Sequence, residues 1–313
     1  MWDKVLERWT WAFAEPIGTV VVAVAAVVGI LLLSRRTRHL ARAQGRSVAP
    51  VLRLAAAAVV VAWGVDLVVR AIASVGLEDA WWTFALPVAV AAGGLGVATL
   101  LRGRGVRRTG TPTMVGVRRA WWTFPSRGLL WTGTAITLVL IVVTLVCGGV
   151  SLPDERGRFV RVDFGDAGWA TFYGWTFGIP VLVGLAALVA VTVILLSRIA
   201  APAFLGPSTV ARERRERRVA ADSVLAVSAG AVALALGGAL FLVGAVGSSS
   251  GGVGIPGVGE FSWTPGYSVF APFLRWVGWA LLLAGNVVLL SVAAGATAVV
   301  WPEAMPLRAG VST

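Results

Sequence analysis

The sequence predicts an all-α membrane protein, a polytopic bundle of transmembrane helices. Its 313 residues are 58% hydrophobic and only 13% charged, with a mean hydropathy of +0.84, whereas soluble domains carry about 25% charged residues. Several nearly uncharged runs reach the length of roughly 18 residues that indicates a membrane-spanning helix. These runs are too continuously apolar for the alternating strands of a membrane barrel, so helices alone are expected to cross the membrane.

Seven spans are expected, each long enough to cross a hydrocarbon core of about 30 Å. They cover residues 16–34, 50–70, 82–101, 129–151, 176–197, 223–247 and 272–301 of one integral membrane domain, 1–313. The third span is either locally short or begins nearer Trp82, because Pro87 and Leu101 are close together in sequence. The last span is long enough to predict a tilt, a kink near Gly285, or a protruding end.

The basic residues predict the orientation. Twenty of the 27 Lys and Arg residues lie in 35–53, 102–127, 198–218 and the C-terminal tail, against five in the N-terminal tail and 152–174. Basic connections stay on the cytoplasmic side of a membrane. We therefore expect the N-terminus outside and the C-terminus inside, with a lone first helix followed by three outer hairpins. The basic connections 102–128 and 198–222 would then be cytoplasmic, and 152–174 and 248–271 would be outer loops.

An aromatic–proline motif opens four of the spans. Its aromatic residues are expected to anchor at the membrane–water interface, and its proline to begin a helix, where the missing N–H is tolerated. The anchors are Trp11, Phe13, Pro16, Trp82, Phe84, Pro87, Trp175, Phe177, Pro180, Phe270 and Pro272. Gene duplication and convergence on the same interface chemistry explain the repetition equally well.

The connections and one span suggest further local structure. The alternation in 158–164 predicts a short strand, whereas the Gly- and Ser-rich 248–266 segment predicts a flexible loop. Ser208 or Thr209 can cap a basic helix over 212–218, expected to run along or into the inner surface before the sixth span. Small residues spaced as Ala229-x3-Ala233-x3-Gly237 favour close packing of that span.

Polar residues within the spans are candidate functional residues. Asp66 is the only acidic one, and Arg70 lies one turn away, so the two can pair on one helix face. We expect an outer polar cluster of Asp66, Arg70 and Arg275, with Glu78 or Asp79 above it. The alternative is that Asp66 and Arg70 only neutralise each other and reach outward to water. Asn286 is expected to make an interhelical polar contact, with lining of a solute path as the alternative.

The residues that catalysis usually requires are scarce. His39 is the only histidine and Cys147 the only cysteine, and Cys147 lies in an apolar run. No nucleotide-binding Gly-x4-Gly-Lys-Ser/Thr motif occurs. We therefore expect no cofactor, no metal and no enzymatic activity. The net charge of +12 is ascribed to topology and to anionic lipid at the cytoplasmic face, and not to nucleic acid.

These observations predict a non-catalytic membrane subunit or accessory partner of a transport or signalling complex. The alternative is a small-solute or ion transporter with a path through the helix bundle, although few polar or broken helices support it. A chain rich in Ala, Gly, Val and Arg has the composition of a GC-rich bacterial genome. We therefore expect the plasma membrane of a bacterium.

Overall fold

A computed structural model describes the second to sixth predicted spans and most of the seventh. The described residues are 18–19, 24, 49–73, 76–103, 120–164, 169–202, 204, 210–249, 251–255, 259–263 and 265–295. The first span at 16–34, except for three residues, and the anchors Trp11, Phe13 and Pro16 lie outside them. The structural statements that follow concern the described residues.

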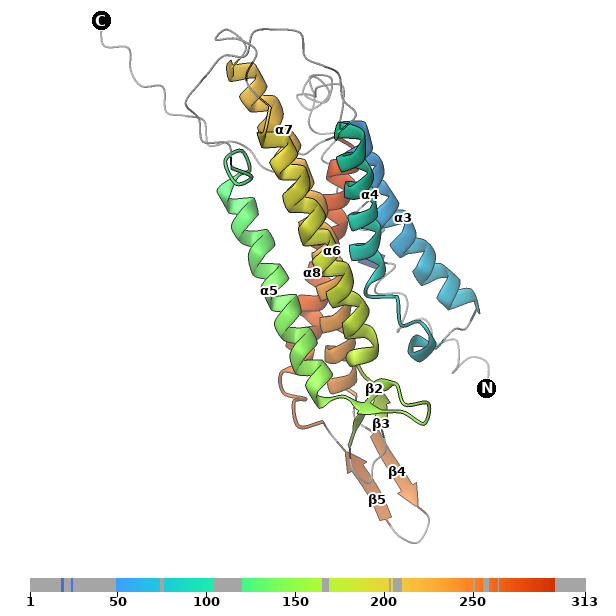
Figure 1. Ribbon diagram of the computed structural model, residues 1–313. Helices are drawn as coiled ribbons and strands as arrows, with labels where there is room; N and C mark the ends of the chain where they lie inside the picture. Colours follow the sequence, from blue (N-terminus) through green and yellow to red (C-terminus); the bar gives the residue numbers. More distant parts are fainter. Residues whose placement is uncertain are drawn as a thin grey trace, which may run out of the picture.

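The described chain is mostly helical. Its helices are α3 (Ala49–Ala73), the short 3-10 helix η1 (Leu77–Asp79), α4 (Leu86–Gly103), α5 (Arg127–Val150), α6 (Trp175–Ala200), α7 (Val210–Gly247) and α8 (Ala271–Ala293). Apart from η1, consecutive helices run in opposite directions (Figure 1). Five of them, α3, α5, α6, α7 and α8, are long and apolar enough to cross a membrane, whereas α4 is a shorter apolar helix. The chain therefore has the helices of an integral membrane protein.

Two small antiparallel sheets correct the all-α prediction. The first sheet has the order β1 (Leu152–Pro153), β2 (Phe159–Asp163) and β3 (Trp169–Thr171), and the second pairs β4 (Gly251–Ile255) with β5 (Gly259–Trp263). Strand β2 confirms the strand predicted at 158–164. The segment 248–266, expected to be a flexible loop, contains a regular hairpin, in which Val253 pairs with Phe261. Both sheets lie at the same end of the bundle (Figure 1).

The lengths of two helices resolve the ambiguous spans. Helix α4 begins at Leu86 with Pro87 as its second residue, so this helix is locally short, at 18 residues or about 27 Å. Helix α8 ends at Ala293 instead of 301. Gly295 has a φ of 72° and donates its N–H to the Val292 carbonyl, a conformation that glycine adopts readily after a helix. The 23 residues of α8 need no extra tilt to fit a membrane of ordinary thickness.

Helix α7 joins two segments that were predicted to be separate. The basic helix near 212–218 and the span at 223–247 form one helix of 38 residues, about 57 Å long. No glycine or proline interrupts 210–229. Pairs four residues apart, including Arg212–Glu216 and Arg218–Asp222, stabilise its first turns. The first turns of α7 project beyond the ends of the neighbouring helices (Figure 1).

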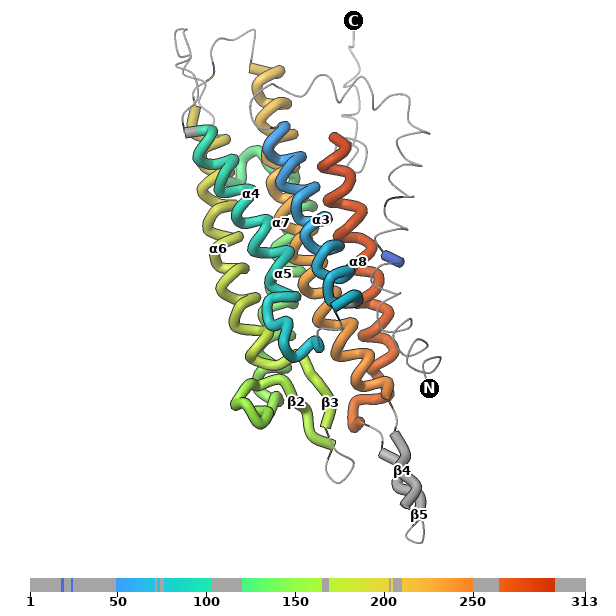
Figure 2. Tube along the Cα trace, turned by 90° about the vertical axis from the view of Figure 1, so that its right-hand side faces the viewer, coloured from blue at the N-terminus to red at the C-terminus, as the bar shows by residue number. Residues whose placement is uncertain are grey.

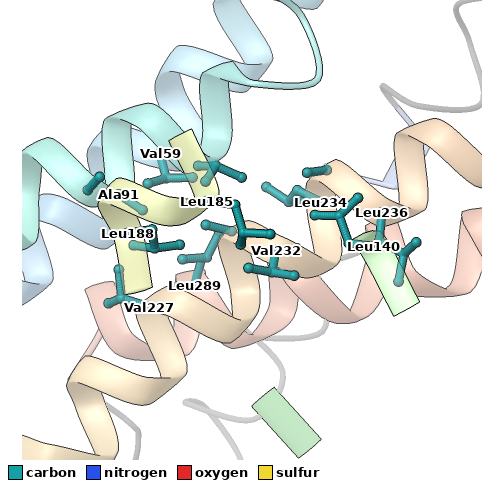
Figure 3. Packing of buried hydrophobic residues seen from close by; sticks show 14 of the residues in the cluster. Val59, Ala91, Leu140, Leu185, Leu188, Val227, Val232, Leu234, Leu236 and Leu289 are labelled. Carbon is teal, nitrogen blue, oxygen red and sulfur yellow. The ribbon is translucent and has the colours of Figure 1, made fainter. Parts of the chain in front are cut away.

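The core of the bundle forms around α7, which contacts α3, α4, α5, α6 and α8. Figure 3 shows apolar side chains from all six long helices meeting there. They include Val59, Ala91, Leu140, Leu185, Leu188, Val227, Val232, Leu234, Leu236 and Leu289, all buried. In Figure 2, α3 lies beside α8, and α4 lies beside α6.

Helices α7 and α8 approach most closely along a row of small residues. Gly230, Gly237 and Gly244 recur every seven residues on α7, facing Gly285, Gly278 and Ala271 of the antiparallel α8. A Cβ atom at Gly237 would lie 2.8 Å from both the Gly278 carbonyl oxygen and the Leu282 nitrogen. The backbones can therefore meet only because no side chain stands between them.

Candidate functional site

The predicted Asp66–Arg70 pair forms on α3. Arg70 Nη2 lies 2.9 Å from Asp66 Oδ2, and Arg70 Nε donates to the same oxygen at 3.0 Å. Trp82 Nε1, from the turn before α4, donates to the other oxygen, Oδ1, at 3.0 Å. The Asp66 and Arg70 side chains are only 8% and 6% exposed. The pair therefore lies within the protein and does not reach out to water, and the indole of Trp82 joins it to the next helix.

The other members of the predicted outer cluster make contacts of their own. The Arg275 guanidinium lies over the Phe241 ring of α7, 5.5 Å from its centroid. Asp79 binds Arg158 at 2.8 Å and Arg156 at 3.1 Å. The described contacts thus show one polar group centred on Asp66 and another at the first sheet, and a cluster that also includes Arg275 stays a prediction.

The group at the first sheet is organised by Asp154. This carboxylate accepts hydrogen bonds from the backbone N–H groups of Arg156 and Arg158 and from Arg158 Nε, at 2.9, 2.8 and 2.8 Å. Desolvation alone would raise the pKa of Asp154, but these hydrogen bonds and the nearby Arg158 charge hold that pKa below its usual value. The bonds to Asp154 and Asp79 raise the pKa of Arg158. Arg158 also donates to the Glu78 carbonyl at 2.9 Å, which attaches η1 to the sheet.

Two of the predicted interface anchors belong to the core instead. Phe84 and Phe177 are buried. The Phe84 ring meets the rings of Tyr173 and Phe177 edge to face, with centroids 5.2 and 5.3 Å apart. A Cβ atom at Gly238 of α7 would lie 3.0 Å from Phe84. The motif thus directs these phenylalanines between helices, where aromatic pairs add packing energy, and not toward lipid.

The prolines of the motif also differ in position. Pro87 and Pro272 are each the second residue of their helix, as predicted. Pro180 instead lies inside α6, which begins at Trp175. The ring of Trp175 covers Gly148 of α5, where a Cβ atom would lie 2.6 Å from it. Helix α6 thus starts before the proline, whose missing N–H costs the helix one backbone hydrogen bond.

The remaining anchors fit an interface position, which stays a prediction. Phe270 lies with Phe273 and Trp276 on an exposed aromatic surface at the start of α8. Trp82 is also exposed, although its N–H is bound to Asp66.

Asn286 makes a contact within its own helix. Its Nδ2 donates to the Leu282 carbonyl at 2.9 Å, and its buried Oδ1 has no hydrogen-bond partner. The polar contacts between helices come from residues that the sequence analysis did not select. Thr144 meets Tyr173 at 3.2 Å, and Thr192 meets Ser228 at 2.8 Å. The occurrence of Ser and Thr inside apolar spans was the only available signal.

The end of the bundle opposite the sheets is joined by further polar contacts. Asp222 Oδ1 of α7 accepts the Ser126 N–H at 2.7 Å, just before α5 begins. Arg198 Nη1 of α6 donates to the Thr99 carbonyl of α4 at 2.6 Å. Arg217 is buried, pairs with Glu213 at 3.3 Å, and lies 4.4 Å from the centroid of the Phe204 ring.

The described residues contain no group of three or more His, Cys, Asp or Glu side chains placed to hold a metal ion. Cys147 is a buried free thiol. Comparison with protein families, curated proteins and solved structures gives no significant match. The function is therefore inferred from the geometry of the bundle and from the charges at its two ends.

Proposed function

We propose that the protein is a non-catalytic, multi-pass membrane subunit or accessory partner of a transport or signalling complex. The observation that carries this proposal is the centre of the bundle, where α7 is itself the core. Its apolar turns are mostly buried, and its glycines touch the backbone of α8. Carriers usually place broken helices and polar groups near the membrane midplane, whereas here a continuous apolar helix fills that position. A rigid scaffold is the role that such packing serves best.

We also propose the seven-span topology, with the N-terminus outside and the C-terminus inside, in a bacterial plasma membrane. The charges at the two described ends support this orientation. The end where α3 and α7 begin carries mainly arginine: Arg53, Arg102, Arg127, Arg198, Arg212, Arg214, Arg215, Arg217 and Arg218. The sheet end is rich in carboxylates: Asp66, Glu78, Asp79, Asp154, Glu155 and Asp163. The arginine-rich end is the one expected to face the cytoplasm.

A small-solute or ion transporter is the second candidate, and one observation favours it. Asn286 is fully buried, and its Oδ1 has no hydrogen-bond partner among the described residues, although buried polar atoms are nearly always hydrogen-bonded. A solute or water that binds there would supply the missing donor. A transport path needs more than one polar atom along it, and Asn286 supplies a single carbonyl oxygen, so we favour the scaffold over the transporter.

Chemical cross-linking in native membranes, followed by purification of the tagged full chain, tests the scaffold. We expect a stoichiometric membrane partner to be recovered with the protein. The purified chain, reconstituted alone in liposomes, should show no solute or ion flux. Flux by the wild type that Asn286→Leu abolishes would overturn the scaffold and establish the transporter.

A further inference from the structure

The first turns of α7 carry more arginine than their own carboxylates can neutralise. Three carboxylates each have an arginine four residues away. The pairs are Arg212–Glu216 at 3.0 Å, Arg217–Glu213 at 3.3 Å and Arg218–Asp222 at 4.0 Å. Arg214 and Arg215 are left over, exposed to solvent and without an ion pair in the described part of the chain; Arg214 lies 5.9 Å from the centroid of the Phe204 ring, which leaves its charge unneutralised. Their positive charge is therefore available to a ligand outside the bundle.

These arginines share one face of the helix. Positions 214 and 215 lie four and three residues before Arg218, so the three side chains are neighbours on the helix surface. Arg218 is exposed as well, whereas Arg217 faces the bundle and is buried. The outward face thus presents a compact positive surface, which we name the α7 arginine face: Arg214, Arg215 and Arg218.

The height of the α7 arginine face above the apolar core follows from the contact between α7 and α5. Asp222 accepts the Ser126 N–H at 2.7 Å, so Asp222 is level with the start of α5. Trp122, just before α5, and Trp131, in its second turn, are exposed. Exposed tryptophans mark the membrane–water boundary. At 1.5 Å per residue, Arg218 lies about 6 Å beyond that level, and Arg214 and Arg215 about 10–12 Å beyond it.

This height matches the layer of lipid headgroups. A bilayer of about 40–45 Å with a core of about 30 Å leaves roughly 5–8 Å of headgroup on each side. Arg218 lies within that layer, and the other two lie within a Debye length, about 8 Å, of its surface. Long arginine side chains can also reach back toward it. A soluble acidic protein would require no such closeness to the boundary.

We propose that the α7 arginine face binds the phosphate headgroups of anionic phospholipids in the leaflet around this end. The inference rests on the proposed placement of the bundle in the membrane, but not on the existence of a protein partner. Guanidinium groups suit phosphate oxygens because they donate several hydrogen bonds and always carry charge. Bound lipid would hold the projecting turns of α7 against the membrane surface.

Native mass spectrometry of the full chain in a neutral detergent tests the proposal, with phosphatidylglycerol and phosphatidylcholine added in equal amounts. We expect the wild type to retain phosphatidylglycerol preferentially. Removing two surface arginines, as in Arg214→Gln/Arg215→Gln, should lower that preference about thirtyfold, at about fivefold for each charge near an anionic surface. Equal retention of the two lipids by the wild type, or unchanged preference in the variant, would overturn the proposal.

Two matched variants separate charge from folding. Arg212→Gln/Glu216→Gln removes one pair from the same turns without changing the net charge, and should keep the preference. Arg214→Lys/Arg215→Lys retains the charge, and should also keep most of it. If a soluble polyglutamate bound the wild type in the same arginine-dependent way while phosphatidylglycerol did not, the surface would belong to an acidic protein and the lipid proposal would fail. The recovery of a membrane partner in cross-linking is independent of all these outcomes.

Discussion

Helices α8 and α5 both pack on α7, but they are attached in different ways. Helix α8 meets α7 along its length through backbone contacts at Gly230, Gly237 and Gly244. Helix α5 stands at the edge of the bundle (Figure 1), and exposes much of its apolar surface. Its polar contacts are at Ser126, which binds Asp222 of α7 just before α5 begins, and at Thr144, which meets Tyr173 before α6.

The difference shows two solutions to one problem of membrane proteins. Lipid tails are as apolar as leucine, so burial of apolar surface between helices in lipid contributes little, and close packing or polar contacts must hold them together. The α7–α8 pair uses close packing along its length, whereas α5 combines the polar contacts of Ser126 and Thr144 with close packing at Gly148 beside Trp175. The α3–α4 hairpin combines both, with Gly94 against Ala55 and Trp82 bound to Asp66.

A side chain placed between α7 and α8 should have the largest effect. In Gly237→Leu, the new Cβ atom would lie 2.8 Å from two backbone atoms of α8 that cannot move aside. Overpacking of this kind costs about 3 kcal/mol, measured as the free energy of unfolding during titration with SDS in mixed micelles. The control is Gly93→Leu, because nothing lies within 4 Å of a Cβ atom there. Equal stability of the two variants would show that the glycine contacts do not hold the pair.

Loss of the buried charge on α3 should have the next largest effect. Asp66→Asn keeps an acceptor for Trp82 but leaves the Arg70 charge uncompensated. A lone charge at the membrane centre costs about 2.5–3.5 kcal/mol, and Asp66 lies nearer a helix end, so we expect a loss of about 2 kcal/mol in the same titration. The double variant Asp66→Asn/Arg70→Gln should recover much of the loss. A double variant no more stable than the single one would count against the ion pair.

The polar attachment of α5 should contribute less, and its loss should act locally. Asp222→Ala removes the acceptor of the Ser126 N–H, and hydrogen bonds to charged groups contribute about 1.5 kcal/mol. Hydrogen–deuterium exchange should rise in the first turns of α5 while α8 stays protected. Arg218→Gln is the control, since it removes the ion pair with Asp222 at 4.0 Å but keeps Asp222 as the acceptor of the Ser126 N–H. Faster exchange in both helices would mean that α5 and α8 are not held independently.

The sequence predicted the elements better than their faces. Hydropathy and proline positions located six of the helices, and alternation located β2, because these signals are local. The close-packing face of α7 was predicted at Ala229, Ala233 and Gly237, whereas the structure uses a seven-residue row that shares only Gly237. Ala229 instead faces α5, because a Cβ atom built at Gly133 of α5 would lie 3.9 Å from the Ala229 Cβ atom. In so Ala-rich a helix, composition does not identify which partner lies on which side.

The polar sites show the same limit. The Asp66–Arg70 pair was predictable, since four residues on one helix fix the geometry. The Trp82 contact and the Asp222 contact join distant segments, and no spacing in the sequence encodes them. Phe84 and Phe177 looked like interface anchors because an aromatic residue beside a span suits both lipid and core. Their contacts with each other and with Tyr173, which join distant segments, place them in the core.

The smallest effect should come from acid at the first sheet, which lies outside the spans. The pKa of Asp154 is lowered in the folded protein, so its charged form stabilises the fold above the ordinary pKa of about 3.9. This stabilisation is lost as the pH falls through the lowered value, and exchange of the backbone amides in β2 should then rise. Asp154→Asn should show fast exchange already at neutral pH, and little further change in acid.

Glu155→Gln should behave like the wild type, because Glu155 is 90% exposed and lies 3.9 Å from Arg161. If Glu155→Gln shifted the acid response and Asp154→Asn did not, the stability of the sheet would depend on its exposed charges. Asp154 would then not be the carboxylate that organises the sheet.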